Sequence, residues 1–524
     1  MITKANPSIN YSYLGIAAIF GFLGFMMEPT AYTWGEQDMM PFFERVFDPN
    51  FLTNDFFTNT TVVKNPRWVY GYFIVAISSI TTLPWYAVLY ILKLILLIFS
   101  PVIYFRVLIV LLRRYVREIV LIRLYPFVLI CLVLMVFLKD FRDYFSVASW
   151  WSYSPALHAY NISTILGFIA ILLKERGNRV LWYLPFFFLS CFVHPAMGLF
   201  CIAFYGVLLT PDFSKELKQF LPVLAIGIIA VVLVKLLFAT QQSLPTSEFI
   251  DIYVKERHSW HYSVPDFINQ KGDWCIFFIL MNILFMIPFM YGVLQKRKTL
   301  RLLALCTWFS YSGAIAAQYF FIDVIPIKLI AYLGISRYTT FGYWMLIVLW
   351  STFLSYFLTK KKAPVLPTLG GKNFAILIIN LIFVGIIFID DPKEVHYNNQ
   401  KAYFDFVRST PKDAIFITHT RPMNTDMRII GQRGVFISDE FPFTEQSIDE
   451  YGDRWKLVYG SRKKGNNPRA FYRGLGPKDF YEIAKKYRLD YVVVENGHVD
   501  QFSDVQPVWQ NGRYSIYSIK NLRN

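Results

Sequence analysis

Long apolar blocks, separated by short polar connections, follow one another along most of the chain before residue 389. A helix of about 20 residues crosses roughly 30 Å of hydrocarbon, so a window of that length locates segments that can span a membrane. The pattern predicts an α-helical polytopic membrane protein with about eleven transmembrane helices in residues 1–389. The blocks lie at about 10–27, 85–111, 119–138, 155–173, 180–193, 196–209, 220–239, 273–293, 302–322, 337–358 and 373–389.

Two places in this pattern leave a choice open. The blocks 180–193 and 196–209 are short and meet at His194-Pro195, so they fit a helical hairpin or one long broken helix. Residues 66–82 are also apolar and aromatic, but a span there would put the next basic connection on the wrong side. We therefore expect residues 68–80 to form an amphipathic helix at the outer interface, where Trp and Tyr are favoured. A true extra span is the alternative.

The basic connections indicate the orientation in the membrane, because short cytoplasmic loops carry an excess of Lys and Arg. Every second connection is basic or contains Lys, and these connections lie at 113–118, 174–179, 215–218, 295–301 and 359–362. The opposite connections are richer in aromatic, acidic and His residues, and they include long outer loops at 28–68 and 240–272. With a cytoplasmic N-terminus, an odd number of spans places the C-terminus outside, and the hairpin interpretation agrees with this count.

Residues 390–524 form a separate soluble domain in this interpretation. The composition becomes mixed and polar after residue 389, and about 130 residues are enough for an independent core. Helical patterns at 401–407 and 480–487 alternate with β-rich runs at 414–418 and 491–494, which predicts a small α/β extracytoplasmic domain. The sequence has no P-loop and no GxGxxG motif, so nothing supports nucleotide-driven pumping.

The composition argues against a soluble nucleic-acid-binding protein, although the formal net charge is +16. The chain is 55% hydrophobic with a mean hydropathy of +0.39, more apolar surface than a soluble fold can hide. Much of the basic charge lies between apolar blocks, so it indicates topology and no nucleic-acid partner. All five cysteines lie in apolar segments without a CxxC pair, and we expect neither disulfide bonds nor a zinc site.

Carboxylates in the first outer loop are the candidate catalytic residues. Glu36, Asp38 and Asp55 lie there, close to the aromatic Trp34. A carboxylate near the bilayer can deprotonate a hydroxyl acceptor as a general base, and its oxygens also suit a divalent cation such as Mg²⁺ or Mn²⁺. Glu36 and Asp55 are the preferred candidates for both roles. The alternative is that a solvent-facing loop needs some carboxylates in any case.

The second long outer loop contains the dense cationic and aromatic run Arg257-His258-Ser-Trp-His261-Tyr262. Arg and His pair with phosphate oxygens, whereas Trp and Tyr stack on a sugar ring or rest at the level of lipid headgroups. His194 and Arg337 add two polar groups near the outer ends of helices, where burial is costly and often functional. An interfacial loop with aromatic anchors is the alternative for the run.

A series of short motifs carries a resemblance to a known family. In chain order they are Trp34-Gly35-Glu36-Gln37, Pro41, Asp48-Pro49 with Asp55, His194-Pro195, Arg257-His258-Ser-Trp-His261, Arg433-Gly-Val-Phe and Phe441-Pro442-Phe443. With many spans, a long acidic first outer loop and an outward C-terminal domain, the chain resembles the GT-C glycosyltransferases. It looks most like a subgroup of bacterial polytopic membrane proteins with this architecture, and the resemblance covers most of its length.

The resemblance implies a membrane glycosyltransferase that moves a sugar from a polyprenyl-phosphate-linked donor to a glycan, lipid or protein acceptor. The reaction would take place at the outer face of the bacterial inner membrane, with the lipid tail between helices. A first-loop carboxylate would be the base, although Gln37 separates Glu36 from Asp38 here, whereas the family commonly has an adjacent acidic pair. The residues implied in substrate binding are Trp34, His194, Arg257, His258, His261, Tyr262 and Arg337.

Two other functions stay open: a polysaccharide polymerase or ligase, and a non-enzymatic transporter or scaffold of envelope glycan assembly. A transporter is expected to have paired broken helices at midplane depth and polar clusters on both sides, whereas the polar candidates here gather on one side. In the C-terminal domain, Arg428, Arg433 and Asp439 are candidate surface contacts for an acceptor. The alternative is that Arg433 and residues 441–443 stabilise a small fold.

Overall fold

The chain folds into two compact units. The helical unit comprises Met1–Pro29, Leu89–Leu236 and Trp260–Ile389, and the α/β unit comprises Thr30–Val88, Leu237–Ser259 and Asp390–Asn524. The computed structural model describes residues 11–27, 39–137, 157–209, 213–238, 244–257, 262–270, 274–358, 370–389, 392–418, 421–438, 442, 444–461 and 468–523.

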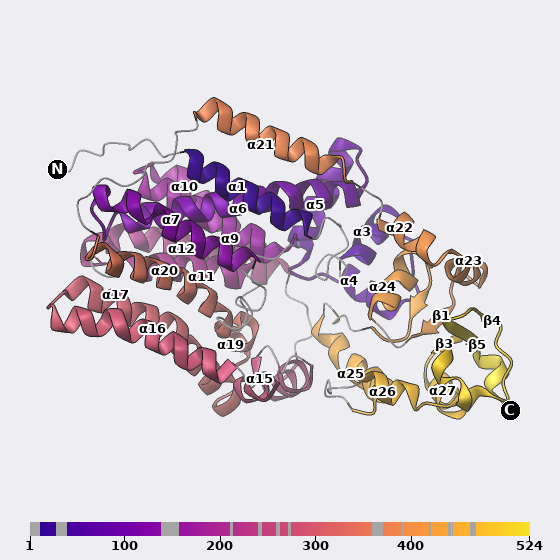
Figure 1. The fold of residues 1–524 in the computed structure, drawn as a ribbon. Coiled ribbons are helices and arrows are strands. Elements are labelled where there is room, and N and C mark those ends of the chain that lie inside the picture. Colours follow the sequence, from indigo (N-terminus) through magenta and orange to yellow (C-terminus); the bar gives the residue numbers. More distant parts are fainter. Residues whose placement is uncertain are drawn as a thin grey trace. The chain divides into compact units, whose positions relative to one another are not determined.

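A helix forms at every apolar block of the sequence, as predicted (Figure 1). The block at 302–322 is irregular, because two π-helical segments, η4 (Phe309–Gly313) and η5 (Phe320–Val324), flank α18 (Ala314–Tyr319). The helices at the blocks are α1 (Tyr11–Met26), α6 (Trp85–Leu112), α7 (Glu118–Phe137), α9 (Ala159–Glu175), α10 (Val180–Val193), α11 (Pro195–Leu208), α12 (Phe213–Phe238), α16 (Trp274–Leu294), α17 (Lys298–Trp308), α20 (Thr339–Ser355) and α21 (Gly371–Ile386). Shorter helices of the helical unit are α15 (Val264–Gln270) and α19 (Lys328–Leu333).

Three helical stretches within the described ranges are long and apolar enough to cross a membrane, judged by length and composition. They are Trp85–Leu112, Glu216–Phe238 and Lys298–Val324. Shorter apolar helices such as Val180–Val193 accompany them, and its 14 residues reach about 21 Å, less than the thickness of the hydrocarbon layer. The structure thus confirms a mostly helical protein with segments able to span a bilayer, while the number of spans stays a prediction.

The chain reverses direction between α10 and α11. His194 alone separates the two helices, with extended backbone dihedrals of φ −148° and ψ 96°. A Cβ atom added at Gly198 would lie 2.4 Å from the Cα of Cys191, whereas residues seven apart on one straight helix are about 10 Å apart. The two short blocks therefore form a hairpin, and a long broken helix does not fit this close approach.

Aromatic side chains fill part of the interior of the helical unit. The ring of Phe168 on α9 lies 5.3 Å from Tyr104 of α6, 5.7 Å from Phe204 of α11 and 5.7 Å from Trp344 of α20, measured between centroids. Aromatic pairs bury large apolar areas and prefer particular ring orientations. Three other helices, α6, α11 and α20, thus pack around one residue of α9.

The α/β unit contains a five-stranded mixed sheet in the order β2-β1-β3-β5-β4. β1 (Ile415–Ile417) pairs in parallel with β2 (Gly434–Val435) and β3 (Tyr491–Glu495). β5 (Tyr514–Ser518) pairs antiparallel with β3 and with β4 (Trp509–Gln510). The strands predicted at 414–418 and 491–494 are confirmed as β1 and β3.

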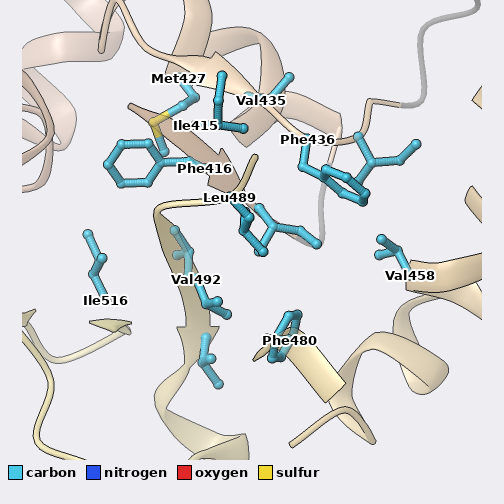
Figure 2. Packing of buried hydrophobic residues seen from close by; sticks show 14 of the residues in the cluster. Ile415, Phe416, Met427, Val435, Phe436, Val458, Phe480, Leu489, Val492 and Ile516 are labelled. Carbon is cyan, nitrogen blue, oxygen red and sulfur yellow. The ribbon is translucent and has the colours of Figure 1, made fainter. Parts of the chain in front are cut away.

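Helices alternate with the strands in this unit, so the predicted small α/β fold is confirmed. Figure 2 shows the core, in which Phe416 of β1, Val492 of β3 and Ile516 of β5 lie among apolar residues of the surrounding segments. The helices predicted at 401–407 and 480–487 are α23 and α27. The helices of residues 392–523 are α22 (Pro392–Asn399), α23 (Lys401–Ser409), α24 (Arg421–Ile429), α25 (Ile448–Tyr459), α26 (Pro468–Arg473) and α27 (Pro477–Lys486).

The α/β unit also contains segments of both predicted outer loops, so it is assembled from three stretches of chain. The helix α3 (Met40–Phe47) packs against α24, and the π-helical η3 (Ile250–Arg257) packs against α25. The helix expected at residues 68–80 is confirmed as α5, while its place at the membrane interface stays a prediction. The loop elements are α3 (Met40–Phe47), α4 (Phe56–Val62), α5 (Trp68–Thr81), α13 (Thr246–Phe249) and the π-helical η3 (Ile250–Arg257).

Two buried tyrosines should make the α/β unit less stable at alkaline pH. Burial raises the pKa of Tyr403 and Tyr472 well above the ordinary value of 10.0. A pKa that is higher in the folded than in the unfolded state stabilises the fold fully below the unfolded value, and this contribution is lost as the pH rises. We therefore expect the free energy of unfolding to lose this contribution above about pH 10.

Parallel pH titrations of circular dichroism and tyrosinate absorbance on the full chain will check this. Tyr472→Phe should show a shallower alkaline decline, although it also loses the hydrogen bonds from the Tyr472 hydroxyl to the backbone oxygens of Ile417 and Val493, at 3.3 and 2.8 Å. If all 34 tyrosines ionise while the circular dichroism stays unchanged, the expectation fails.

Candidate functional site

Four of the predicted catalytic and substrate-binding residues have described side chains. Asp55 belongs to the α/β unit, whereas His194, Tyr262 and Arg337 belong to the helical unit. Arg257 ends η3, but its side chain lies outside the described part of the structure. Residues that lie wholly outside the described ranges are Trp34, Glu36, Asp38, His258, His261 and Asp439. The described geometry therefore bears on Asp55 in the α/β unit, and on His194 and the Tyr262–Arg337 contact in the helical unit.

The structure brings Tyr262 and Arg337 into contact. Nη2 of Arg337 donates a hydrogen bond to the Tyr262 hydroxyl at 2.8 Å, and the guanidinium carbon lies 5.1 Å from the centre of the Tyr262 ring. Arg337 lies in the short 3-10 helix η6 (Ile335–Tyr338), directly before α20. A guanidinium that is already held in one orientation loses less conformational freedom when it binds an anion.

Gln318 on α18 holds both partners of this contact, and sequence reasoning missed it. The side chain is fully buried; its Nε2 donates to the backbone oxygen of Tyr262 at 2.9 Å, and its Oε1 accepts from the backbone nitrogen of Ser336 at 3.1 Å. Breaking either bond would leave a buried polar group unpaired, so the amide fixes both backbone segments. The sequence feature that could have identified Gln318 is a polar amide inside an apolar block.

Backbone irregularities surround this contact. Gly334 has φ +58°, in the left-handed region that glycine tolerates best. A Cβ there would lie 3.1 Å from the Tyr262 ring and 3.2 Å from Nε of Arg337, so the position needs a residue without a side chain. The π-helical segments η4 and η5 flank α18, and such turns are frequent at functional sites. Tyr262, Gln318, Gly334, Ser336 and Arg337 are called the Arg337 site below.

His194 lies at the hairpin turn and has a structural role there. Its Nδ1 accepts a hydrogen bond from the backbone N–H of Met197 at 3.3 Å, so the imidazole caps the N-terminus of α11. A ring nitrogen that accepts this bond carries no proton. The ring centre lies 6.3 Å from Tyr160, on which His158 stacks at 4.5 Å. His158 is a second imidazole at this turn that sequence reasoning missed.

Aromatic packing links the hairpin to the Arg337 site within the helical unit. The rings of Phe200 on α11 and Tyr338 of η6 have centroids 5.4 Å apart. Both rings also lie near Phe341 of α20, at 6.4 and 5.6 Å. The helix that begins after His194 and the segment that carries Arg337 therefore share one aromatic cluster.

Asp55, one of the two preferred candidate bases, is fully buried in the α/β unit. Its Oδ2 accepts from the backbone N–H of Thr58 at 2.7 Å and caps α4, and its Oδ1 accepts from the backbone N–H of Val435 at 2.8 Å. Both carboxylate oxygens therefore already have backbone donors, and the side chain exposes no surface to an acceptor hydroxyl.

A cluster of ion pairs joins the ends of several helices in the helical unit. Arg114 contacts Glu175 through two nitrogen–oxygen pairs at 3.0 and 2.7 Å, and the Tyr205 hydroxyl donates to the same carboxylate. Glu216 lies 3.7 Å from Arg114 and 3.5 Å from Lys174. Three connections that the sequence assigns to one side, at 113–118, 174–179 and 215–218, thus meet in one place.

The prediction that Arg428 and Arg433 are surface contacts is wrong, because both side chains are buried. Arg433 donates to the backbone oxygens of Arg408 at 2.6 Å and Gln432 at 2.9 Å, and also to Thr410. Desolvation lowers the pKa of Arg433. The burial and the hydrogen bonds of Arg433 agree with the alternative that it stabilises the small fold, which stays a prediction.

No group of three His, Cys, Asp or Glu side chains suited to a metal ion occurs within the described ranges. The cation prediction concerns Glu36 and Asp55, and the first of these lies outside those ranges. Mg²⁺ or Mn²⁺ binding therefore stays a prediction. Among the described site residues, Arg337 carries a guanidinium, a group whose chemistry suits an anion.

No family profile and no curated protein sequence matches the chain. The described parts define the class of protein: a helical protein with segments able to cross a bilayer, and an α/β unit assembled from three stretches of chain. A polar site around one arginine lies in its helical unit.

Proposed function

We propose that the protein is a GT-C-type membrane glycosyltransferase that uses a polyprenyl-phosphate-linked sugar at the outer face of the bacterial inner membrane. About eleven helices span the membrane in this proposal, and the α/β unit is extracytoplasmic. The Arg337 site is the observation that carries it: a guanidinium is oriented by Tyr262, whose backbone Gln318 holds, within a unit of apolar helices. A fixed cation beside a bilayer suits the phosphate of a lipid-linked donor.

An apolar groove in the same unit offers a surface for the lipid tail. Its volume is about 760 Å³, and it is lined by one face of α16 together with Phe353 of α20. The lining residues of α16 recur every three to four positions, from Phe278 to Leu294, as one face of a helix requires. An isoprenoid chain needs such apolar surface, so the groove and the cation together suit an amphiphilic donor.

In the proposed reaction, the acceptor oxygen attacks the anomeric carbon, and the bond from that carbon to the phosphate oxygen breaks. A carboxylate takes the proton of the acceptor hydroxyl as general base. Glu36 and Asp38 are the candidates for this role, because Asp55 is fully buried and its oxygens face backbone donors. Arg337 compensates the negative charge that develops on the departing polyprenyl phosphate.

Arg337→Gln is expected to weaken the binding of polyprenyl phosphate about tenfold or more, because a charge-assisted hydrogen bond contributes roughly 1.5–3 kcal/mol. Titration of a fluorescent polyprenyl phosphate into nanodiscs that contain the protein will measure this. Arg297→Gln is the matched control, since Arg297 also lies over a tyrosine, with its guanidinium carbon 5.2 Å from the ring centre of Tyr356, but is exposed. Unchanged binding in Arg337→Gln, or equal losses in both variants, would refute the assignment.

The proposed topology predicts the behaviour of reporter fusions. Alkaline phosphatase, which is active outside the cytoplasm, should be active at the C-terminus and inactive at the basic connection 295–301. The meeting of three basic connections in the Arg114 cluster supports placing them on one side, and the positive-inside rule makes that side cytoplasmic. Activity in the opposite pattern would reverse the topology and remove the Arg337 site from the outer face.

A polysaccharide polymerase or ligase and a non-enzymatic transporter or scaffold are the alternatives. A polymerase or ligase also uses a lipid-linked phosphate, so analysis of the transferred product separates it from a transferase of single sugars. A scaffold needs no polyprenyl phosphate, and wild-type protein without measurable binding would favour it.

A further inference from the structure

Three consecutive residues of the first outer loop are embedded in the fold made by residues 392–523. These residues are Asp55, Phe56 and Phe57, and they lie in the same α/β unit as that fold. The carboxylate of Asp55 caps α4 and also contacts the edge strand β2, where the Val435 N–H donates to it at 2.8 Å. One side-chain bond therefore joins positions 380 residues apart.

Phe56 is held by a cation from the C-terminal part of the unit. The guanidinium carbon of Arg454 on α25 lies 4.4 Å from the centre of the Phe56 ring and 5.1 Å from that of Phe436. Nη1 of Arg454 also donates to the backbone oxygen of Phe436 at 3.0 Å. Arg454 thus lies over both Phe56 and Phe436, the residue that directly follows the Asp55 partner Val435.

Phe57 is part of the hydrophobic core of the unit. It is 2% exposed and packs edge-on against Tyr451 of α25, with centroids 5.8 Å apart. Val435, Phe436 and Val458, which Figure 2 labels, belong to the same buried cluster. The first loop therefore supplies a core residue that residues 392–523 do not contain.

The second outer loop is attached to the same fold. The backbone N–H of Leu244 donates to Oε2 of Glu445 at 2.8 Å, and η3 packs against α25. Both loops that carry candidate site residues are thus held by elements of the C-terminal part.

We propose that Asp55 is a positioning residue that docks the first outer loop on the C-terminal fold, and that it is not the general base. A base needs an oxygen that the acceptor hydroxyl can reach, whereas Asp55 is fully buried and both its oxygens face backbone donors. The inference rests on the proposed function where it concerns catalysis; the docking itself rests on geometry alone. The proton transfer then falls to another carboxylate of the first outer loop.

A disulfide can replace the docking bond and leave no carboxylate. An ideal Cβ at Gly434 lies 3.4 Å from the Cβ of Asp55, close to the roughly 3.5–4.5 Å of disulfide bridges. It also lies 2.5 Å from Cδ1 of Ile415, the end of a side chain that must shift to admit a cysteine. Asp55→Cys combined with Gly434→Cys should therefore crosslink when full-length protein is oxidised with diamide. Mass spectrometry of the linked peptides identifies this pair among the five native cysteines, which are all free.

Hydrogen exchange then tests the docking without any assay of activity. Asp55→Cys alone should speed amide exchange in α4 and β2 more than tenfold, and the oxidised double variant should restore protection. Dithiothreitol should abolish that restoration. Asp55→Asn provides a milder variant that can still cap α4, and it should speed exchange at β2 more than in α4. Folded double variant that forms no crosslink, or unchanged exchange in Asp55→Cys, would overturn the docking.

Sugar transfer in cells separates positioning from catalysis. The oxidised double variant should retain the envelope glycan that the wild type makes, and reduction should remove it. Restored protection without the glycan would overturn the proposal, because the carboxylate itself would then be required. Wild type that makes no glycan would refute the proposed function, while the exchange data would still decide the docking. Asp48→Asn is the exchange control, since its carboxylate accepts from Asn50 within the same exposed turn.

Discussion

Replacement of Arg433 by methionine is expected to lower the free energy of unfolding of the α/β unit by about 3–5 kcal/mol. The arginine is 4% exposed, and methionine preserves much of its apolar volume but none of its donors. Each acceptor left buried without a donor is costly. The acceptors are the backbone oxygens of Arg408, Thr410, Gly431 and Gln432 and the hydroxyl of Thr410.

Urea unfolding of the full-length protein in detergent, followed by tryptophan fluorescence, measures this loss, because Trp455 is fully buried in the same unit. Arg488→Met is the control: Arg488 pairs with Asp413 at the surface and thereby lowers the pKa of that carboxyl. Exposed pairs contribute little, so this variant should unfold close to the wild type. Similar midpoints for the two variants would show that the buried arginine is not a main support of the fold.

Glu175→Leu is expected to destabilise the helical unit by about 3 kcal/mol or more. The change removes the hydrogen-bonded partner of Arg114, which keeps only the longer 3.7 Å pair with Glu216. It also removes the acceptor of the Tyr205 hydroxyl, at a position whose side chain is 9% exposed. Arg114→Met combined with Glu175→Leu should be more stable than Glu175→Leu alone, since no unpaired charge remains at the helix ends. Arg114 is 21% exposed, which reduces this difference.

Thermal aggregation in detergent, followed by size-exclusion chromatography, will rank the wild type, both single variants and the double variant. Unfolding free energies of the same four proteins from denaturant titrations should give a double-mutant coupling of roughly 1–3 kcal/mol between Arg114 and Glu175. Asp251→Leu, which breaks the exposed Lys255–Asp251 pair, is the control and should leave the aggregation temperature unchanged. Additive effects of the two substitutions would mean that the cluster does not act as a unit.

The helices and the α/β character could be predicted because both depend on neighbouring residues. A long apolar run forms a helix wherever it lies, since its backbone groups then pair within the segment. The strand at Tyr491–Glu495 was visible as a short β-branched run between polar residues. These signals extend over a few residues, so they do not say which segments meet.

The candidate site could be predicted only in part. Arg337 and Tyr262 were visible as a cation and an aromatic ring near helix ends, and the structure joins them. The sequence alone offers no role for Gln318, because its amide links two backbone segments, at Tyr262 and Ser336, that only the fold brings to it. Arg433 was misplaced at the surface, because a charged residue is usually exposed unless the fold surrounds it with acceptors.

Asp55 shows most clearly where local pattern stops and tertiary structure begins. The carboxylate before a helix is a recognisable cap, and its bond to Thr58 follows from three residues of sequence. Its second bond goes to Val435, across 380 residues, and exists because two distant stretches of chain build one core. Local propensity acts over a few bonds, whereas burial and hydrogen-bond pairing depend on every segment that packs nearby. From the sequence alone Asp55 is therefore a candidate base, whereas its tertiary contacts support the proposed docking role.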